Sequence, residues 1–319
     1  MTTPGSRRTL VARRLLGALP LLLGVTLVSF TLTVHFGPDQ AWELLGRNPT
    51  PEQVEQVQRQ LGQDRPFLMR YGEFLQRLTR LELGHSQASG ESVTGLLART
   101  VPVSLLALAP GFVLGIALAL ALALAAAWRP GGRIDRLCRG LSSLGMSLSV
   151  VITVIALQAI FGVWLDWFPV RGWAVDNAAS YLAHVAVPTM AMVAANLGYN
   201  LRFFRAVLVA TINEPPARTA LAYGLPKSRI LTRYVLRAAL LPILTRVVFS
   251  VPLILISGSL VIESHLGIPG AGRITFDAVT SGDQPVLMAV VSLSAVLFVV
   301  ALTAADLLAR LVDPRIRAA

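Results

Sequence analysis

The chain has 319 residues, of which 54% are hydrophobic and 14% are charged, and its mean hydropathy is +0.65. An average soluble domain carries roughly 25% charged residues, so this chain lacks the polar surface that a soluble enzyme of its length needs. Its low charge also excludes a disordered chain. The single cysteine, Cys138, excludes an internal disulfide and a cysteine-rich metal site. The class that remains is a polytopic membrane protein.

Six apolar runs are long enough to cross a bilayer, because a spanning helix needs about 20 largely apolar residues. Only the fifth run contains a formal charge, Arg246. We therefore predict an all-α, polytopic membrane protein with six transmembrane helices. The predicted spans are residues 15–36, 101–127, 140–165, 181–201, 238–262 and 284–305.

Basic residues gather in alternate loops between these runs. The amino-terminal tail and residues 128–139, 202–237 and 306–319 together carry 18 basic and 4 acidic residues, whereas the other three loops carry 9 and 13. Because short cytoplasmic loops are enriched in Arg and Lys, both termini are predicted to be cytoplasmic. The net charge of +11 then follows from membrane topology, and no nucleic-acid partner is expected.

The first predicted outer loop, residues 37–100, is too long for a simple connector. Residues 50–53 read Thr-Pro-Glu-Gln, which predicts a capped helix that runs to about Leu61. Apolar residues then recur at three- and four-residue spacing over residues 67–81. This pattern predicts an amphipathic helix that lies on the membrane face or on a partner. The plainer alternative is a helical cap packed on the spans.

The sequence contains no motif for covalent chemistry. A phosphate-binding loop needs Gly-x-x-x-x-Gly-Lys-Ser/Thr, but the only lysine, Lys227, follows Pro226. The four histidines lack metal-ligand spacing, and no carboxylate lies at the centre of a predicted span, which argues against a proton relay. We therefore expect no cofactor, no metal and no catalysis, and any ATP that is used must bind to another chain.

The most informative segment is predicted to be cytoplasmic, over residues 211–245. Pro215 and Pro216 suit the first turn of a short helix. Small residues, which allow a partner backbone to approach closely, follow the two prolines. They are Ala217, Ala220, Ala222 and Gly224. The sequence therefore predicts a slim helix that docks in a groove of another protein.

This segment resembles the cytoplasmic coupling loop, or EAA loop, of ABC importer permeases. More closely, it resembles the peptide and nickel branch, of the dipeptide/oligopeptide permease B type. The branch pattern Arg-Thr-Ala-x-Ala-x-Gly-Leu is matched by residues 218–225, and its Pro-x-x-Thr by residues 242–245. Shorter matches lie at residues 83–86, 167–172, 262–273 and 313–317. Their order and spacing extend the resemblance over nearly the whole chain.

The sequence departs from the branch at several positions. Pro215 and Pro216 replace a usual acidic–aromatic pair, and Arg246 stands where an uncharged residue is usual. These departures leave the solute open. The resemblance implies uptake of dipeptides or oligopeptides across the plasma membrane, with nickel or glutathione as the alternative solutes. A secondary transporter or channel and a membrane enzyme are weaker rivals.

The resemblance also implies an architecture and an assembly. The fold would be the transmembrane domain of a type I ABC importer, with a permease domain over residues 92–308 and a coupling loop at about 211–230. Residues 1–91 would add the first helix and the outer helical loop, and residues 309–319 a cytoplasmic tail. The implied partners are a second permease subunit in a heterodimer, two ABC ATPase subunits or domains, an extracytoplasmic solute-binding protein and the lipid bilayer.

Two sets of functional residues are predicted. The residues expected to couple the chain to the ATPase are Glu214, Ala217, Arg218, Thr219, Ala220, Ala222 and Gly224. The residues expected along the translocation path are Arg246, Asn196, Asn200 and Gln158. Two interpretations of Arg246 stay open. Its guanidinium either contacts a carboxylate in the path, such as a peptide C-terminus, or extends toward the cytoplasmic headgroups.

Overall fold

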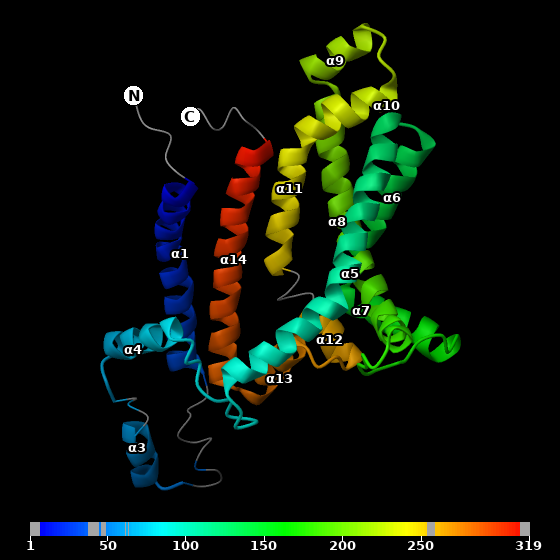
Figure 1. Ribbon diagram of the computed structural model, residues 1–319. Coiled ribbons are helices and arrows are strands. Elements are labelled where there is room, and N and C mark those ends of the chain that lie inside the picture. Colours follow the sequence, from blue (N-terminus) through cyan, green and yellow to red (C-terminus); the bar gives the residue numbers. More distant parts are fainter. Residues whose placement is uncertain are drawn as a thin grey trace, which may run out of the picture. The chain divides into compact units, whose positions relative to one another are not determined.

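The computed structural model describes residues 7–37, 45, 49–60, 62, 64–253 and 259–312. The described part is helical, and its single β-bridge joins His85 to Ser92. The chain forms two compact units, the first made of Met1–Arg99 with Ile274–Val299 and the second of Thr100–Arg273 with Val300–Ala319 (Figure 1). The predicted ending at 313–317 lies outside the described residues, as do residues 254–258 of the predicted fifth span.

Four described helical stretches are long and apolar enough to cross a membrane. They are α5 (Val93–Trp128), α8 (Ala178–Ile212), the stretch Lys227–Pro252 and α14 (Gln284–Val312). The stretch Lys227–Pro252 comprises α10 (Lys227–Arg229), η2 (Ile230–Val235) and most of α11 (Leu236–Leu253). The chain is therefore an all-α, polytopic membrane protein.

The predicted third span is not a straight helix. Residues 140–165 are divided between α6 (Arg133–Ser147), α7 (Val150–Leu157) and the π-helical segment η1 (Gln158–Trp164), and the two arms meet at 98°. Counting this bent pair as one span gives five spans among the described residues. The helix α1 (Arg7–Phe36) contributes a shorter apolar stretch, Leu19–His35. The predicted number of six spans is thus not established by the structure.

The bend lies at Leu148 and Ser149, whose extended backbone has ψ values of 128° and 137°. On the α6 side, Gly145 packs against Gly198 of α8, where a Cβ on Gly145 would lie 3.2 Å from the Gly198 Cα. Helices α6, α7 and α8 line a largely apolar cavity of about 950 Å³ around the bend. No proline marks this break in the sequence.

In the first unit, the capping signal at residues 50–53 forms as predicted. The Thr50 N–H donates to Gln53 Oε1 at 3.0 Å, and the Gln53 N–H donates to Thr50 Oγ1 at 3.4 Å. These two bonds start α3 (Pro51–Gln60) and satisfy amides that the first helical turn leaves free.

The predicted amphipathic helix is α4 (Phe67–Thr79), and it crosses α1 (Figure 1). Phe30 of α1 is the centre of the contact, with ring centroids 5.4 Å from Phe67 and 5.6 Å from both Tyr71 and Phe74. The Tyr71 hydroxyl also donates to the Leu23 carbonyl at 2.9 Å. The helix is therefore a cap on a neighbouring helix, the plainer of the two predicted alternatives.

In the second unit, two apolar cores lie at opposite ends of α5 and α8. One joins the later turns of α5 and α8 to η2, α9 (Pro215–Ala222) and α11, and it includes Ala126, Phe204 and Leu231. The other joins the earlier turns to α7 and α12 (Ser259–Leu266), and it includes Leu108 and Ile262. The two basic loops of the sequence, which flank the first core, thus share one end of this unit.

Candidate functional site

The predicted coupling helix forms as α9, beyond the end of α8 (Figure 1). It begins with Pro215 and Pro216 at its first two positions, after Glu214 at the N-cap. It ends at Ala222, and Gly224, two residues later, has a φ of +70°, a left-handed conformation that glycine adopts without strain. The Gly224 N–H donates to the Leu221 carbonyl at 3.0 Å, and the Leu225 N–H to the Ala220 carbonyl at 3.2 Å. The helix is therefore sharply bounded at both ends.

The small residues of α9 do not all face outward. Ala217 and Ala220 are buried in the apolar core that also contains Ile230 and Leu231 of η2, because the chain folds back over this side of the helix. The other five predicted coupling residues are exposed, namely Glu214, Arg218, Thr219, Ala222 and Gly224. The prediction that Ala217 and Ala220 face a partner is therefore corrected.

The exposed side of α9 and its C-cap carry two large residues that the sequence prediction missed. Leu221 is 58% exposed and Tyr223 is 84% exposed. Both side chains sit beside exposed predicted residues, Ala222 and Gly224. A helix fixed by its alanine side and open on an aromatic and aliphatic side can bind a second protein.

An ion pair behind α9 stiffens this end of the second unit. Asp135 of α6 is 1% exposed and accepts from the Arg205 guanidinium of α8, with Nη2 at 2.9 Å from Oδ2. The Gly131 N–H donates to the same oxygen at 2.9 Å, and Arg139 lies 3.8 Å away. The carboxylate thus joins α6, α8 and the loop before α6. Sequence reasoning missed this pair because 70 residues separate its members.

Arg246 of α11 lies over an aromatic ring. Its Cζ lies 5.8 Å from the ring centroid of Phe203 on α8, and the two side chains line a cavity of about 460 Å³ with neighbouring residues of α11. The Arg246 Nε is buried and has no hydrogen-bond partner among the described residues. The predicted intramembrane charge is therefore next to open space.

The other predicted path residues make separate contacts. Gln158 donates to the Val170 carbonyl at 2.7 Å and so secures the loop after η1. Asn196 donates to the Met192 carbonyl, one turn earlier on α8, at 3.0 Å. Asn200 is 2% exposed, and its Oδ1 has no partner in the described part of the chain. Asn196 and Asn200 lie on the same face of α8 as Phe203 by helical spacing, but of the four predicted path residues only Arg246 lines the cavity.

A buried carboxylate that the sequence prediction did not single out lies between α12 and α13 (Ala271–Ser281). Glu263 is fully buried, and its Oε2 accepts the N–H groups of Gly272 at 2.8 Å and Arg273 at 3.3 Å. Ser104 of α5 accepts the neighbouring Ala271 N–H at 2.8 Å. The carboxylate thus anchors the first turn of α13.

Burial raises the pKa of the Glu263 carboxyl to about 7, and the hydrogen bonds from Ser104 and the two amides oppose this shift only in part. Gly270 is required here, since a Cβ on it would lie 2.5 Å from the Ser104 Oγ and would also clash with the Glu263 carboxylate. The sequence signal for this turn is a glutamate, Glu263, followed four to nine residues later by Gly267, Gly270 and Gly272.

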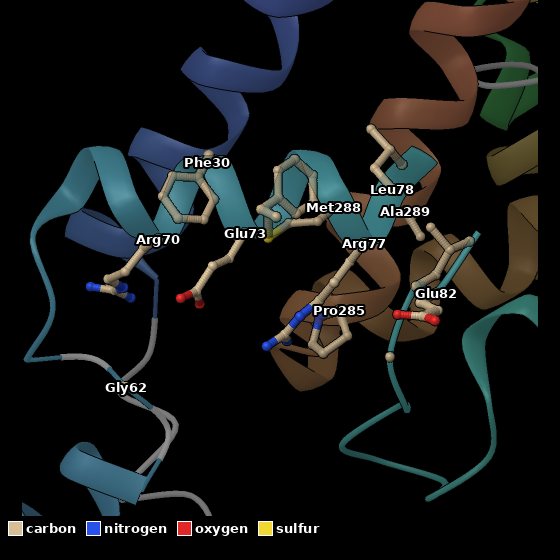
Figure 2. Close-up of a pocket in the computed structure, with 13 residues that line it drawn as sticks. Phe30, Gly62, Arg70, Glu73, Arg77, Leu78, Glu82, Pro285, Met288 and Ala289 are labelled. Atoms are coloured by element: carbon tan, nitrogen blue, oxygen red, sulfur yellow. The ribbon is translucent and has the colours of Figure 1, made fainter. Parts of the chain in front are cut away.

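The first unit carries a cleft of about 260 Å³ between α1, α4 and the start of α14 (Figure 2). Its apolar walls come from Phe30, Pro285, Met288 and their neighbours. Arg70, Glu73 and Arg77 extend from one side of α4, and Glu82 lies beyond the end of the helix (Figure 2). The cleft therefore combines an apolar floor with charges of both signs.

The structure offers no candidate metal site, since no group of three or more His, Cys, Asp or Glu side chains that could hold an ion occurs among the described residues.

Comparisons with known proteins give the chain its family. Residues 111–318 match the model for the binding-protein-dependent transport system inner membrane component, and residues 8–107 match the model for the N-terminal part of such membrane components. The first of these matches covers well over half of the chain.

Similar proteins cover the chain almost completely. A putative peptide transport system permease protein of Brucella abortus (strain 2308) is 28% identical over 97% of this chain and 98% of its own length. The oligopeptide transport system permease protein AppB of Bacillus subtilis (strain 168) is 29% identical over 96% and 98%. A probable peptide ABC transporter permease protein of Sinorhizobium fredii is 27% identical over 96% and 98%. Together with its apolar helices and exposed α9, the matched model shows that the chain belongs to the family of binding-protein-dependent transport system inner membrane components.

Proposed function

We propose that this chain is a transmembrane subunit of an ATP-driven ABC importer for peptides in the plasma membrane. The observation that carries the proposal is the near full-length similarity to permeases whose names specify peptide transport. The chain itself performs no covalent chemistry in this proposal. ATP is hydrolysed by two separate ABC ATPase subunits or domains, and a second permease subunit completes the translocation path.

The ATPase docks on α9 at the cytoplasmic end of the second unit. Leu221 and Tyr223 supply the contact area, and Arg218, Thr219 and Ala222 lie beside them on the exposed side. Because Ala217 and Ala220 are packed into the core with η2, a movement of α9 is passed to the helices as a rigid displacement. This end carries the basic loops, which supports a cytoplasmic position for it and for both termini.

The extracytoplasmic solute-binding protein docks on the first unit. The cleft beside α4 has space for one apolar side chain of the binding protein, and its charged rim offers Arg77 and Glu82 to groups of opposite charge. These contacts would select the partner and orient it. Residues 1–91 then form the part that receives the binding protein, residues 92–308 the permease domain with its coupling loop at about 211–230, and residues 309–319 the cytoplasmic tail.

The test is uptake by the complete importer, reconstituted in proteoliposomes with ATP enclosed and the binding protein outside. We expect labelled dipeptides or oligopeptides to accumulate only when ATP, both permease subunits and the binding protein are present. Accumulation of nickel or glutathione but not of peptides would show that the importer takes up one of the alternative solutes instead. Uptake by this chain alone, without ATP, would make it a secondary transporter or channel.

A further inference from the structure

We propose that Arg246 forms a carboxylate-binding site within the membrane and that this site takes the C-terminal carboxylate of the peptide during transport. The inference rests on the proposed function and names one determinant of its substrate. It starts from a charge that is costly at its position, since an arginine at the centre of a spanning helix costs roughly 2.5–3.5 kcal/mol on insertion scales.

The depth of Arg246 opposes an anchor in the headgroups. Along α11 it lies nine residues beyond Arg237, which is about 13 Å of helix. Its Cζ lies over the ring of Phe203 of α8. Because Arg237 ends the predicted cytoplasmic segment 202–237, the backbone of Arg246 lies inside the predicted fifth span.

The residues that line the cavity around the guanidinium include no carboxylate. The cavity is lined by aromatic, aliphatic and proline side chains and by the Thr245 hydroxyl, which donates to the Leu241 carbonyl at 2.9 Å. Among the described residues, no ion pair involves Arg246, and its buried Nε has no hydrogen-bond partner. The cation–π contact with Phe203 orients the guanidinium but supplies no hydrogen-bond acceptor.

The chemistry of the missing partner follows from the donor. A guanidinium presents parallel N–H groups that match the two oxygens of a carboxylate, and in an apolar cavity this pairing is stronger than in water. Three residues before Phe203, on the same face of α8, the buried Oδ1 of Asn200 is an acceptor that also lacks a partner. The unmet Nε donor of Arg246, which lines the cavity, therefore suits the carboxylate of a peptide end.

The test compares one labelled peptide as its free acid and as its C-terminal amide, in the complete importer reconstituted in proteoliposomes. The quantity measured is the ratio of acid uptake to amide uptake. Because the binding protein is the same for every variant, its own preference between acid and amide cancels when the ratios of variant and wild type are compared.

We expect Arg246→Gln to lower this ratio by roughly tenfold or more, the effect of losing one charge-assisted hydrogen-bonded pair. Arg237→Gln is the matched control, an exposed arginine of the same helix, and it should leave the ratio unchanged. Arg246→Lys keeps the charge without the planar fork, so we expect an intermediate ratio. This second variant decides the question if Arg246→Gln does not assemble.

An unchanged ratio in Arg246→Gln, or in Arg246→Lys where only that variant assembles, would overturn the inference. Equal losses of acid and amide uptake would also overturn it, since they would assign Arg246 to a carboxylate of the second permease subunit or to the lipid. A wild-type importer that takes up neither form of the peptide would instead contradict the proposed function.

Discussion

Two buried carboxylates and one partly buried arginine in the second unit are stabilised in three different ways. Asp135 has a full ion pair with Arg205 and a backbone amide, so its charge is compensated within the protein. Glu263 has only backbone amides and a serine hydroxyl, and it holds a proton more readily than an ordinary glutamate. Arg246 has only an aromatic ring. The degree of compensation separates a structural charge from one that can respond to pH or to a ligand.

Glu263 gives the chain a predictable pH dependence. Because its pKa is raised from 4.5 to about 7, the folded chain keeps a proton that the unfolded chain releases. Stability should therefore fall as pH rises from about 4.5 to 7 and should level off above that, by about 3 kcal/mol in total. Glu263→Gln keeps an acceptor oxygen and removes the titratable carboxyl. The fall of the unfolding midpoint in detergent between pH 4.5 and 7 should therefore be smaller in this variant than in the wild type.

The control for this comparison is Glu214→Gln, which alters an exposed carboxylate on the same chain. Its midpoint should follow the wild type at every pH between 4.5 and 8. The same slope in wild type and Glu263→Gln would show that the carboxylate does not titrate in this window.

Gly270 provides a second prediction for the α12–α13 turn. A methyl group there would clash with Glu263 and Ser104, so we expect Gly270→Ala to destabilise the chain by about 1–3 kcal/mol. Gly140→Ala is the matched control, because a Cβ at that position of α6 meets no other atom within 4 Å. Measured thermal unfolding should separate the two substitutions, and equal midpoints would contradict the packing described for the turn.

At the scale of the element, α9 combines a buried and an exposed side within eight residues. The proposal assigns ATPase binding to the exposed side, so Tyr223→Ala should weaken co-purification of the ATPase by roughly tenfold, the usual effect of removing an anchoring aromatic residue. Membrane levels of the chain should not change. Leu137→Ala, which truncates an exposed residue of α6, is the control and should retain the ATPase. Full retention by Tyr223→Ala would remove the exposed side of α9 from the interface.

Local signals predicted some elements well. The capping residues of α3, the apolar repeat of α4 and the prolines and glycine that bound α9 all act within a few residues of the chain, so sequence patterns reveal them. The bend between α6 and α7 could not be predicted in this way, because residues 146–152 around the break contain neither proline nor glycine.

Features set by distant contacts were missed for a common reason. The burial of Ala217 and Ala220 depends on η2 folding back over α9, and the Asp135–Arg205 pair depends on the packing of α6 against α8. Periodicity describes one helix at a time and cannot say which neighbour covers a face. Arg246 was visible as a charge in an apolar run, but its stacking on Phe203 required the arrangement of two helices.

At the scale of the whole molecule, the distribution of charge predicts the orientation in the membrane. In a Cys138→Ser background, Gln76→Cys on α4 and Ser228→Cys on α10 both place a thiol at an exposed position. In intact cells an impermeant thiol reagent should label Gln76→Cys, and it should label Ser228→Cys only after the membrane is opened. The reverse pattern would invert the topology.

The central claim is that this chain is the membrane subunit of an ATP-driven importer and is coupled to its ATPase through α9. Cross-linking in a transport-competent complex tests it most directly, with a single cysteine at Ala222→Cys on α9 or at Ala179→Cys near the opposite end of α8, both at exposed positions. A short thiol-reactive cross-linker should join the ATPase to Ala222→Cys and not to Ala179→Cys. Cross-linking of the ATPase at Ala179→Cys, or at neither position, would contradict the account.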